Sequence, residues 1–319
     1  MIGARTINRL LSVFDVAITR RTTLDRLVAE RHSLQERLNA GAPPESEDKL
    51  PGSINALRIE LLRHQIALKW SLIDAAEPPD GGADRDAFPS TRRCPLCGYE
   101  TAREHFAVYR SQCIFGGGRL LRFQCPRCDL IFGPDKMLRL SDEELKQEYE
   151  WHYRVYSEGD SSAREMRAFF SLNPSRSGVY LNYGAGAWSR TMKLLRDEGW
   201  QVYAFEPHGS AHSGSPEVIA SKDKLSAMRF DGLFSNNLLE HLRDPVGELR
   251  FMAGLLKPGA VMAHATPCFR YAYEYTRFHL FFYPGRSRRV LMDEAGLSMV
   301  DFTEDGEFIN VVCRPRHNE

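Results

Sequence analysis

From residue 178 onward, short apolar runs alternate with segments whose apolar residues recur at helical spacing. Seven of these runs predict strands: GVYLN (178–182), QVYAF (201–205), EVIA (217–220), FDGLFS (230–235), VMAHA (261–265), SMVDF (298–302) and FINVVC (308–313). Strands that alternate with helices predict a parallel sheet with helices on both faces, a doubly wound α/β fold. Only the turn TEDGE separates the last two strands, which predicts an antiparallel pair at one edge.

The N-terminal half shows helical patterns instead. Leucines recur at helical spacing within residues 1–40, and a second helix is expected over about 53–76. Ser141 and Ser162 are each followed three residues later by glutamate, a spacing typical of capping boxes that begin helices. We therefore divide the chain into a helical N-terminal segment (1–80), a cysteine-rich segment (90–135), a helical connector (136–176) and an α/β domain (177–319).

The cysteine-rich segment contains two Cys-x-x-Cys pairs, formed by Cys94, Cys97, Cys125 and Cys128. Each pair allows two thiolates to face one ion, and two pairs complete the tetrahedral sulfur shell that Zn²⁺ prefers. Four protein ligands leave no position for water, so the pattern predicts a structural zinc in a small zinc ribbon. An iron–sulfur cluster and a redox-active pair are the alternatives. The residues between the pairs are expected to form a hairpin or a three-stranded ribbon.

Composition narrows the partners and the compartment. Lys plus Arg equals Asp plus Glu at 42 each, which argues against bulk electrostatic binding of nucleic acid, so no nucleic-acid partner is expected. No apolar run is long enough to span a bilayer, and the N-terminus does not resemble a signal peptide. Paired Cys-x-x-Cys spacing favours a metal site in a reducing compartment, so we expect a cytoplasmic protein. The mildly basic helix within residues 1–40 is expected to pack on its own protein, with a homo-oligomer contact or a peripheral membrane contact as alternatives.

A glycine bend follows the first strand of the α/β domain. Gly184 and Gly186 lie where the chain leaves this strand, and such residues let backbone approach a ligand closely at the carboxyl edge of a parallel sheet. Glu206 ends the next strand, about 20 residues after the glycines, where its carboxylate can accept hydrogen bonds from ribose hydroxyls. The pattern indicates a nucleoside-containing cofactor.

Residues from about 178 to 315 resemble the class I S-adenosylmethionine (SAM)-dependent methyltransferases. The resemblance rests on the glycine bend, on FDGLFSNNLLEHLRDPVGELRFMAGLLKPGAVMAHATP (230–267) and on RFHLFFYPGRSRRVLMDEAGL (277–297). In the first block, Asp244 with Pro245 behind it is a typical helix start. CPRCDLIFGPD followed by a Tyr-rich helix is similar to family members with an N-terminal zinc ribbon, several of which act on sugars or cell-surface glycans. The resemblance implies a seven-stranded Rossmann-like sheet whose last strand is antiparallel.

The resemblance also implies site residues. Gly184, Ala185 and Gly186 would approach the methionine part of SAM, Glu206 would bind its ribose, and Asn236, Asn237 and Leu238 would line the reaction centre. Asp223 is the nearest candidate for a contact to adenine. Two positions depart from the family pattern: Asn182 replaces the usual acid near the end of strand one, and Trp188 replaces the third glycine. These departures motivate an alternative, a catalytically degenerate methyltransferase-like module that serves as a binding or scaffold domain.

Methyl transfer to an alcohol needs a base beside the acceptor, and histidine is suited to that task. His279, expected in a loop over the pocket, is the preferred base or acceptor-binding residue, with His241 of the Leu-Glu-His element as a second candidate. His264 is expected to be a core histidine with its hydrogen bonds made. The predicted acceptor is a small molecule or glycan, such as a sugar. RNA or protein methylation would require one exposed basic face built from Arg92, Arg93, Arg119, Arg122 and Arg127.

Overall fold

The computed structural model describes residues 52–76, 90–156, 159–186, 190–207, 217–270, 272 and 275–316. The helix expected within residues 1–40 and the side chain of Trp188 lie outside these residues. The chain divides into two compact units, Met1–Gln65 and Ile66–Glu319. Helix α2 (Gly52–Ala76) agrees with the expected range and crosses from the first unit into the second. None of the helices in the described ranges combines the length and apolar character needed to cross a bilayer.

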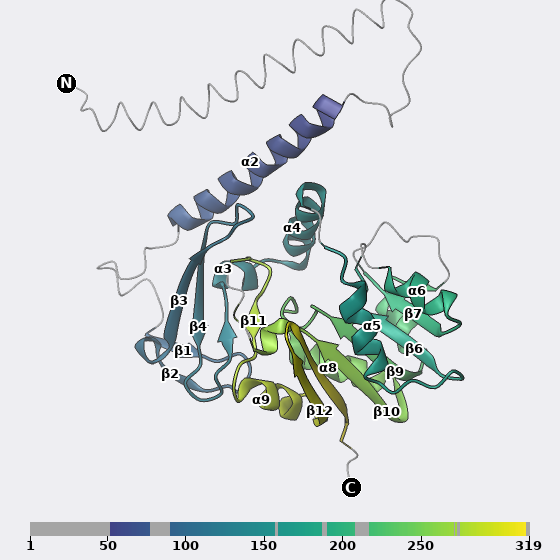
Figure 1. The fold of residues 1–319 in the computed structure, drawn as a ribbon. Coiled ribbons are helices and arrows are strands. Elements are labelled where there is room, and N and C mark those ends of the chain that lie inside the picture. The colour runs from purple at the N-terminus through teal and green to yellow at the C-terminus, as the bar shows by residue number, and fades with distance from the viewer. Residues whose placement is uncertain are drawn as a thin grey trace, which may run out of the picture. The chain divides into compact units, whose positions relative to one another are not determined.

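The second unit contains the predicted seven-stranded sheet (Figure 1). Its strands are β6 (Val179–Tyr183), β7 (Gln201–Phe205), β8 (Val218–Ile219), β9 (Phe230–Asn236), β10 (Leu256–Ala265), β12 (Leu297–Asp305) and β13 (Phe308–Pro315). The spatial order is β12-β13-β10-β9-β6-β7-β8. Strands β6 to β10 pair in parallel, while β13 is antiparallel to both β10 and β12. The doubly wound prediction is confirmed, including the antiparallel pair at one edge.

Helices pack on both faces of this sheet. Helices α5 (Ser162–Phe170) and α6 (Thr191–Asp197) lie on one face, where Phe169 contacts Tyr180 of β6 edge-to-face at 5.2 Å between ring centroids. Helices α8 (Pro245–Gly254) and α9 (Ser287–Glu294) lie on the other, where Tyr183 of β6 approaches Phe251 of α8 at 6.5 Å. Successive side chains of a strand point to opposite faces, so β6 contributes to both cores. Helix α7 (Lys222–Ser226) follows β8.

Helix starts follow the sequence signals in two cases and not in a third. Ser141 and Glu144 form a full capping box on α4 (Asp142–Val155). Asp244 is the N-cap residue of α8, its side chain accepts a hydrogen bond from Gly247 N, and Pro245 is the first helical residue. The expectation that Ser162 caps α5 is wrong, because Ser161 is the N-cap residue and makes no side-chain cap bond. Ser162 is instead the first helical residue, and its hydroxyl donates to Asp160 at 2.5 Å.

The cysteine-rich segment forms two further small sheets. Strands β1 (Thr91–Arg93) and β2 (Glu100–Ala102) pair with each other, followed by the 3₁₀ helix η3 (Arg103–His105). Strands β3 (Ala107–Gln112), β4 (Arg119–Gln124) and β5 (Ile131–Phe132) form a second sheet, and α3 (Asp135–Leu138) follows it. The expected hairpin is present as β3–β4.

This second sheet has a fourth strand that the sequence does not predict. Strand β11 (Phe281–Phe282) comes from the α/β domain and pairs with β5, giving the order β11-β5-β4-β3. The 3₁₀ helix η5 (Pro267–Phe269) lies beside β11, and Tyr283 N donates to Cys268 O at 2.8 Å. The cysteine-rich segment (90–135) and the α/β domain therefore share a sheet and are not structurally independent of each other.

Candidate active site and four-cysteine cluster

The glycine bend lies at the carboxyl end of β6. Gly184 and Gly186 both have positive φ, +75° and +64°, in a region where a side chain is strained. The N–H groups of Gly184 and Ala185 donate to Phe205 O at 2.8 and 3.2 Å, which holds the bend against the end of β7. A Cβ on Gly186 would have no atom of the described residues within 4 Å, so none of these residues crowds this position.

Glu206 and the turn after β9 meet at this bend. Gly186 N donates to Glu206 Oε2 at 2.9 Å, which places the predicted ribose-binding carboxylate directly at the glycines. A Cβ on Gly184 would lie 2.8 Å from Leu238 Cδ1, so the turn that follows β9 packs on the bend. Asn237 in this turn adopts a left-handed φ of +50° and donates through its N–H to Ala265 O at 2.8 Å. Strained backbone of this kind is concentrated at functional sites.

Asn182 has a carboxylate partner that the sequence did not reveal. Its Nδ2 donates to Glu165 Oε2 at 2.8 Å, and both side chains are buried. Glu165 lies on α5 and also accepts from Ser161 Oγ at 2.5 Å. An acid is thus present beside the end of strand one, supplied by a helix and not by the strand itself. Asp223, the adenine candidate, is exposed in the first turn of α7.

The two candidate catalytic histidines are neighbours. The rings of His241 and His279 lie 4.9 Å apart between centroids, at an interplanar angle of 82°. His241 Nδ1 lies 3.2 Å from the Tyr149 hydroxyl. Desolvation, reinforced by the charge of His152, lowers the pKa of His241 to about 4, so its imidazole is neutral at pH 7 and is a weak base. His241 is therefore better suited to orienting groups by hydrogen bonds than to taking up a proton.

His264 is buried in β10 as expected, but only one of its nitrogens is bonded. Its Nδ1 lies 2.8 Å from Ser235 Oγ, while Nε2 has no partner within the described part of the chain. Burial lowers the pKa of His264 to about 3.

Tyr149, an aromatic residue of α4, packs within the protein, since it lies against Phe278 at 4.7 Å between ring centroids.

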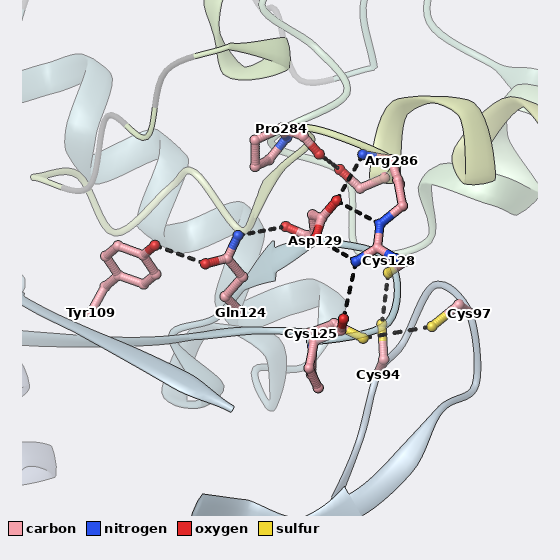
Figure 2. Close-up of polar contacts among 11 residues, drawn as sticks. Cys94, Cys97, Tyr109, Gln124, Cys125, Cys128, Asp129, Pro284 and Arg286 are labelled. Atoms are coloured by element: carbon pink, nitrogen blue, oxygen red, sulfur yellow. Dashed lines mark hydrogen bonds and ion pairs between the residues drawn. The ribbon is translucent and has the colours of Figure 1, made fainter. Parts of the chain in front are cut away.

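The four predicted metal ligands form one group, the four-cysteine cluster (Figure 2). Their sulfur atoms all lie within 4.8 Å of one another, with Cys94 to Cys128 at 3.6 Å and Cys97 to Cys125 at 3.7 Å. Tetrahedral Zn–S bonds of 2.3 Å place sulfurs about 3.8 Å apart, so the donor set fits zinc. The hydrogen bond with Cys128 lowers the pKa of Cys94 to about 5, which favours one thiolate in the cluster.

Arg286 connects the cluster to the α/β domain. Its Nε and Nη2 donate to the two carboxylate oxygens of Asp129 at 2.9 Å each, and Nη2 also donates to Pro126 O at 3.1 Å (Figure 2). These contacts hold the turn between Cys125 and Cys128 against the start of α9. The Arg286 hydrogen bond keeps the pKa of Asp129 below its usual value.

Three of the five arginines considered for a basic face make contacts within the protein, and one of these three is buried. Arg122 is buried and donates to Thr276 O at 2.5 Å, while Arg92 donates to Asp135 at 2.5 Å and covers the ring of Phe123 at 3.5 Å. Arg119 lies at Asp74, with Nε 3.8 Å from a carboxylate oxygen. The arrangement gives no support to nucleic-acid methylation guided by this segment.

One family of known proteins matches part of this chain. Residues 153–301 match the family described as "Methyltransferase domain", a little under half of the chain. The match supports a SAM-dependent methyltransferase. A search of curated protein sequences finds no match.

The fold also resembles solved structures. The CcbJ methyltransferase from Streptomyces caelestis has 14% identity and a TM-score of 0.39, covering 52% of this chain and 95% of that chain. The Burkholderia thailandensis 1,6-didemethyltoxoflavin-N1-methyltransferase, solved with its substrate and S-adenosylhomocysteine, has 15% identity and a TM-score of 0.43, covering 61% of this chain and 93% of that chain.

Proposed function

We propose that this chain transfers a methyl group from SAM to a small-molecule or glycan acceptor, such as a sugar hydroxyl. The observation that carries the proposal is the hydrogen bond from Gly186 N to Glu206, which unites the glycine bend with the carboxylate suited to ribose. Among the described residues none crowds Gly186, and Leu238 packs on Gly184, which fits a cofactor that lies along this bend. Asn236 and Asn237 would then border the methyl group.

SAM supplies an electrophilic methyl group, so the chain's own residues need to bind, orient and deprotonate the acceptor. His279 is a half-buried imidazole next to His241, and we assign it to the base or to acceptor binding. Neutral His241 would orient the acceptor through a hydrogen bond. The Glu165 carboxylate beside Asn182 supports cofactor binding over the degenerate alternative, because it provides an acid where strand one itself has none.

We infer that the four-cysteine cluster holds a structural zinc ion that stabilises the sheet of β3, β4, β5 and β11. The closed sulfur shell leaves no position for a substrate, so its contribution to methyl transfer is to fix the segment that carries His279. None of the seven cysteines is joined in a disulfide, which supports work in a reducing compartment such as the cytoplasm.

The test is release of S-adenosylhomocysteine by the zinc-loaded full chain with a panel of sugars, sugar nucleotides and RNA. Acceptor-dependent release is expected with a sugar-type acceptor and not with RNA. His279→Ala should lower kcat while leaving the affinity for SAM unchanged, and the exposed His105→Ala should change neither. Tight SAM binding without product from any acceptor would favour the scaffold alternative.

A further inference from the structure

A second cluster of metal-binding side chains lies apart from the four cysteines. Glu240 follows the turn after β9, Cys268 lies in η5, and His279 precedes β11. One ligand atom from each of the three lies within 4.8 Å of the others, and Cys268 Sγ is 3.7 Å from His279 Nδ1. Glu240 and Cys268 are fully buried, while His279 is half-buried and gives the cluster its access to solvent.

Backbone hydrogen bonds hold the three segments in place. Leu280 N and Phe281 N donate to Glu240 O at 2.7 and 3.3 Å, which ties the residues after His279 to the Glu240 turn. Cys268 N donates to Thr266 Oγ1 at 3.0 Å, and Thr266 Oγ1 itself donates to Glu240 Oε1 at 2.7 Å. The three side chains therefore converge on rigid backbone, which is what a preorganised ligand site requires.

One oxygen of the Glu240 carboxyl group is not explained by the contacts that the described residues make. Oε2 is buried and has no hydrogen-bond partner among the residues described, although Oε1 is satisfied by Thr266. A buried polar atom without a partner costs free energy and calls for an explanation, such as a bound ion.

A thiolate, an imidazole and a carboxylate on three rigid segments are the ligand types that Zn²⁺ takes in proteins. We propose that Glu240, Cys268 and His279 bind a divalent transition-metal ion, with Zn²⁺ as the ion expected. A bound cation would pair with Glu240 Oε2, and the proton of the Cys268 thiol would leave to solvent as the sulfur binds the ion. Bond lengths near 2.0–2.3 Å require ligand atoms about 3.3–3.7 Å apart, so small side-chain rotations complete the site.

Three protein ligands leave a coordination position open, unlike the four-cysteine cluster. The open position would face the His279 side, because the other two ligands are fully buried. Glu240 is two residues beyond Leu238, so the ion would lie next to the turn assigned to the reaction centre. If the proposed function is correct, the ion takes a hydroxyl oxygen of the acceptor, and His279 serves acceptor binding through the metal. Metal binding itself does not rest on that function.

The experiment compares zinc content among variants of the full chain. The purified protein is stripped with a chelator, reloaded with Zn²⁺, desalted and analysed by elemental mass spectrometry. Cys268→Ser is expected to bind one zinc ion per chain fewer than the unmodified chain. Cys313→Ser removes another fully buried cysteine, on β13, and is expected to retain the full zinc content. Because the readout is a difference, the result does not depend on whether the four-cysteine cluster is filled.

A second variant covers the case in which Cys268→Ser fails to fold. Glu240→Gln keeps the size of the side chain and its contact to Thr266. In a competition titration, this variant is expected to bind the zinc ion of this second site at least about tenfold more weakly than the unmodified chain. Equal zinc content in Cys268→Ser, Cys313→Ser and the unmodified chain, or unchanged affinity in folded Glu240→Gln, would overturn the proposal. SAM binding, measured separately by calorimetry, distinguishes this failure from failure of the proposed function.

Discussion

Replacing Asn182 with aspartate, the acid that the family pattern would place there, should destabilise this protein at neutral pH. Asn182 Nδ2 donates to Glu165 Oε2 at 2.8 Å, and both side chains are buried. The substitution turns this donor into a second carboxylate. At an effective dielectric constant of about 20, two negative charges at that separation repel by about 6 kcal/mol.

The fold can avoid this repulsion by binding one proton between the two carboxyl groups. An ordinary carboxyl has a pKa near 4, and holding its proton costs about 1.4 kcal/mol per pH unit above that value. The cost is therefore about 5 kcal/mol at pH 7.5 and about 2 kcal/mol at pH 5.5. The sign follows from linkage: the folded variant binds more protons than its unfolded chain, so its stability relative to the unmodified protein falls as pH rises.

The assay is urea unfolding of Asn182→Asp and of the unmodified chain at pH 5.5 and pH 7.5. The deficit in free energy of unfolding should grow by about 3 kcal/mol between the two pH values. The double variant Asn182→Asp/Glu165→Gln restores an amide–carboxylate pair and should recover most of the stability and lose the pH dependence. A single variant as stable as the unmodified chain at pH 7.5 would refute the assigned contact.

Three other perturbations test separate parts of the structure. Gly184→Ala should lower the free energy of unfolding by about 1–3 kcal/mol, and by more than Gly186→Ala does. Both glycines have positive φ, but among the described residues only a Cβ at Gly184 would meet Leu238. Thermal unfolding of the two variants measures the difference. Glu148→Gln should cost about 3–5 kcal/mol in urea unfolding, because it leaves the fully buried Arg277 without its carboxylate; a cost below about 1 kcal/mol would contradict the buried pair. Burial lowers the pKa values of three histidines: His152, His241 and His264. Since their unfolded pKa is near 6.5, stability should fall as pH drops from 6.5 toward 4, and a urea midpoint constant over that range would contradict their burial as neutral imidazoles.

Local sequence patterns predicted the α/β sheet because its strands are short apolar runs bounded by turns. QVYAF matches β7 residue for residue, whereas EVIA gives only the two-residue β8, where tertiary pairing limits the strand. The pairing of Ser141 with Glu144 is also local, and the capping box is present. Ser162 with Glu165 has the same spacing, but the Glu165 carboxylate is buried and accepts hydrogen bonds from Asn182 and Ser161 instead. The contact with Asn182 joins a helix to a strand, so a pattern within one helix cannot predict it.

Long-range contacts account for what the sequence did not show. Strand β11 has only Phe281 and Phe282, and it pairs with β5 about 150 residues earlier, so it carries no periodic signal. Cys268 is a lone cysteine in the sequence, and it can be recognised as a candidate metal ligand only when the structure places it beside Glu240 and His279. The glycine bend and Glu206 could be predicted because strand order in a doubly wound sheet brings the ends of consecutive parallel strands together.

Isothermal titration of the zinc-loaded full chain with SAM tests the central claim most directly. One molecule of SAM should bind per chain, and Glu206→Ala should weaken binding about 10–100-fold, since a hydrogen bond to a charged group contributes about 1.5–3 kcal/mol. The exposed Glu294→Ala should bind as the unmodified chain does. Folded, zinc-loaded protein that gives no binding heat, or equal affinity in Glu206→Ala, would contradict a SAM site at the bend between β6 and α6.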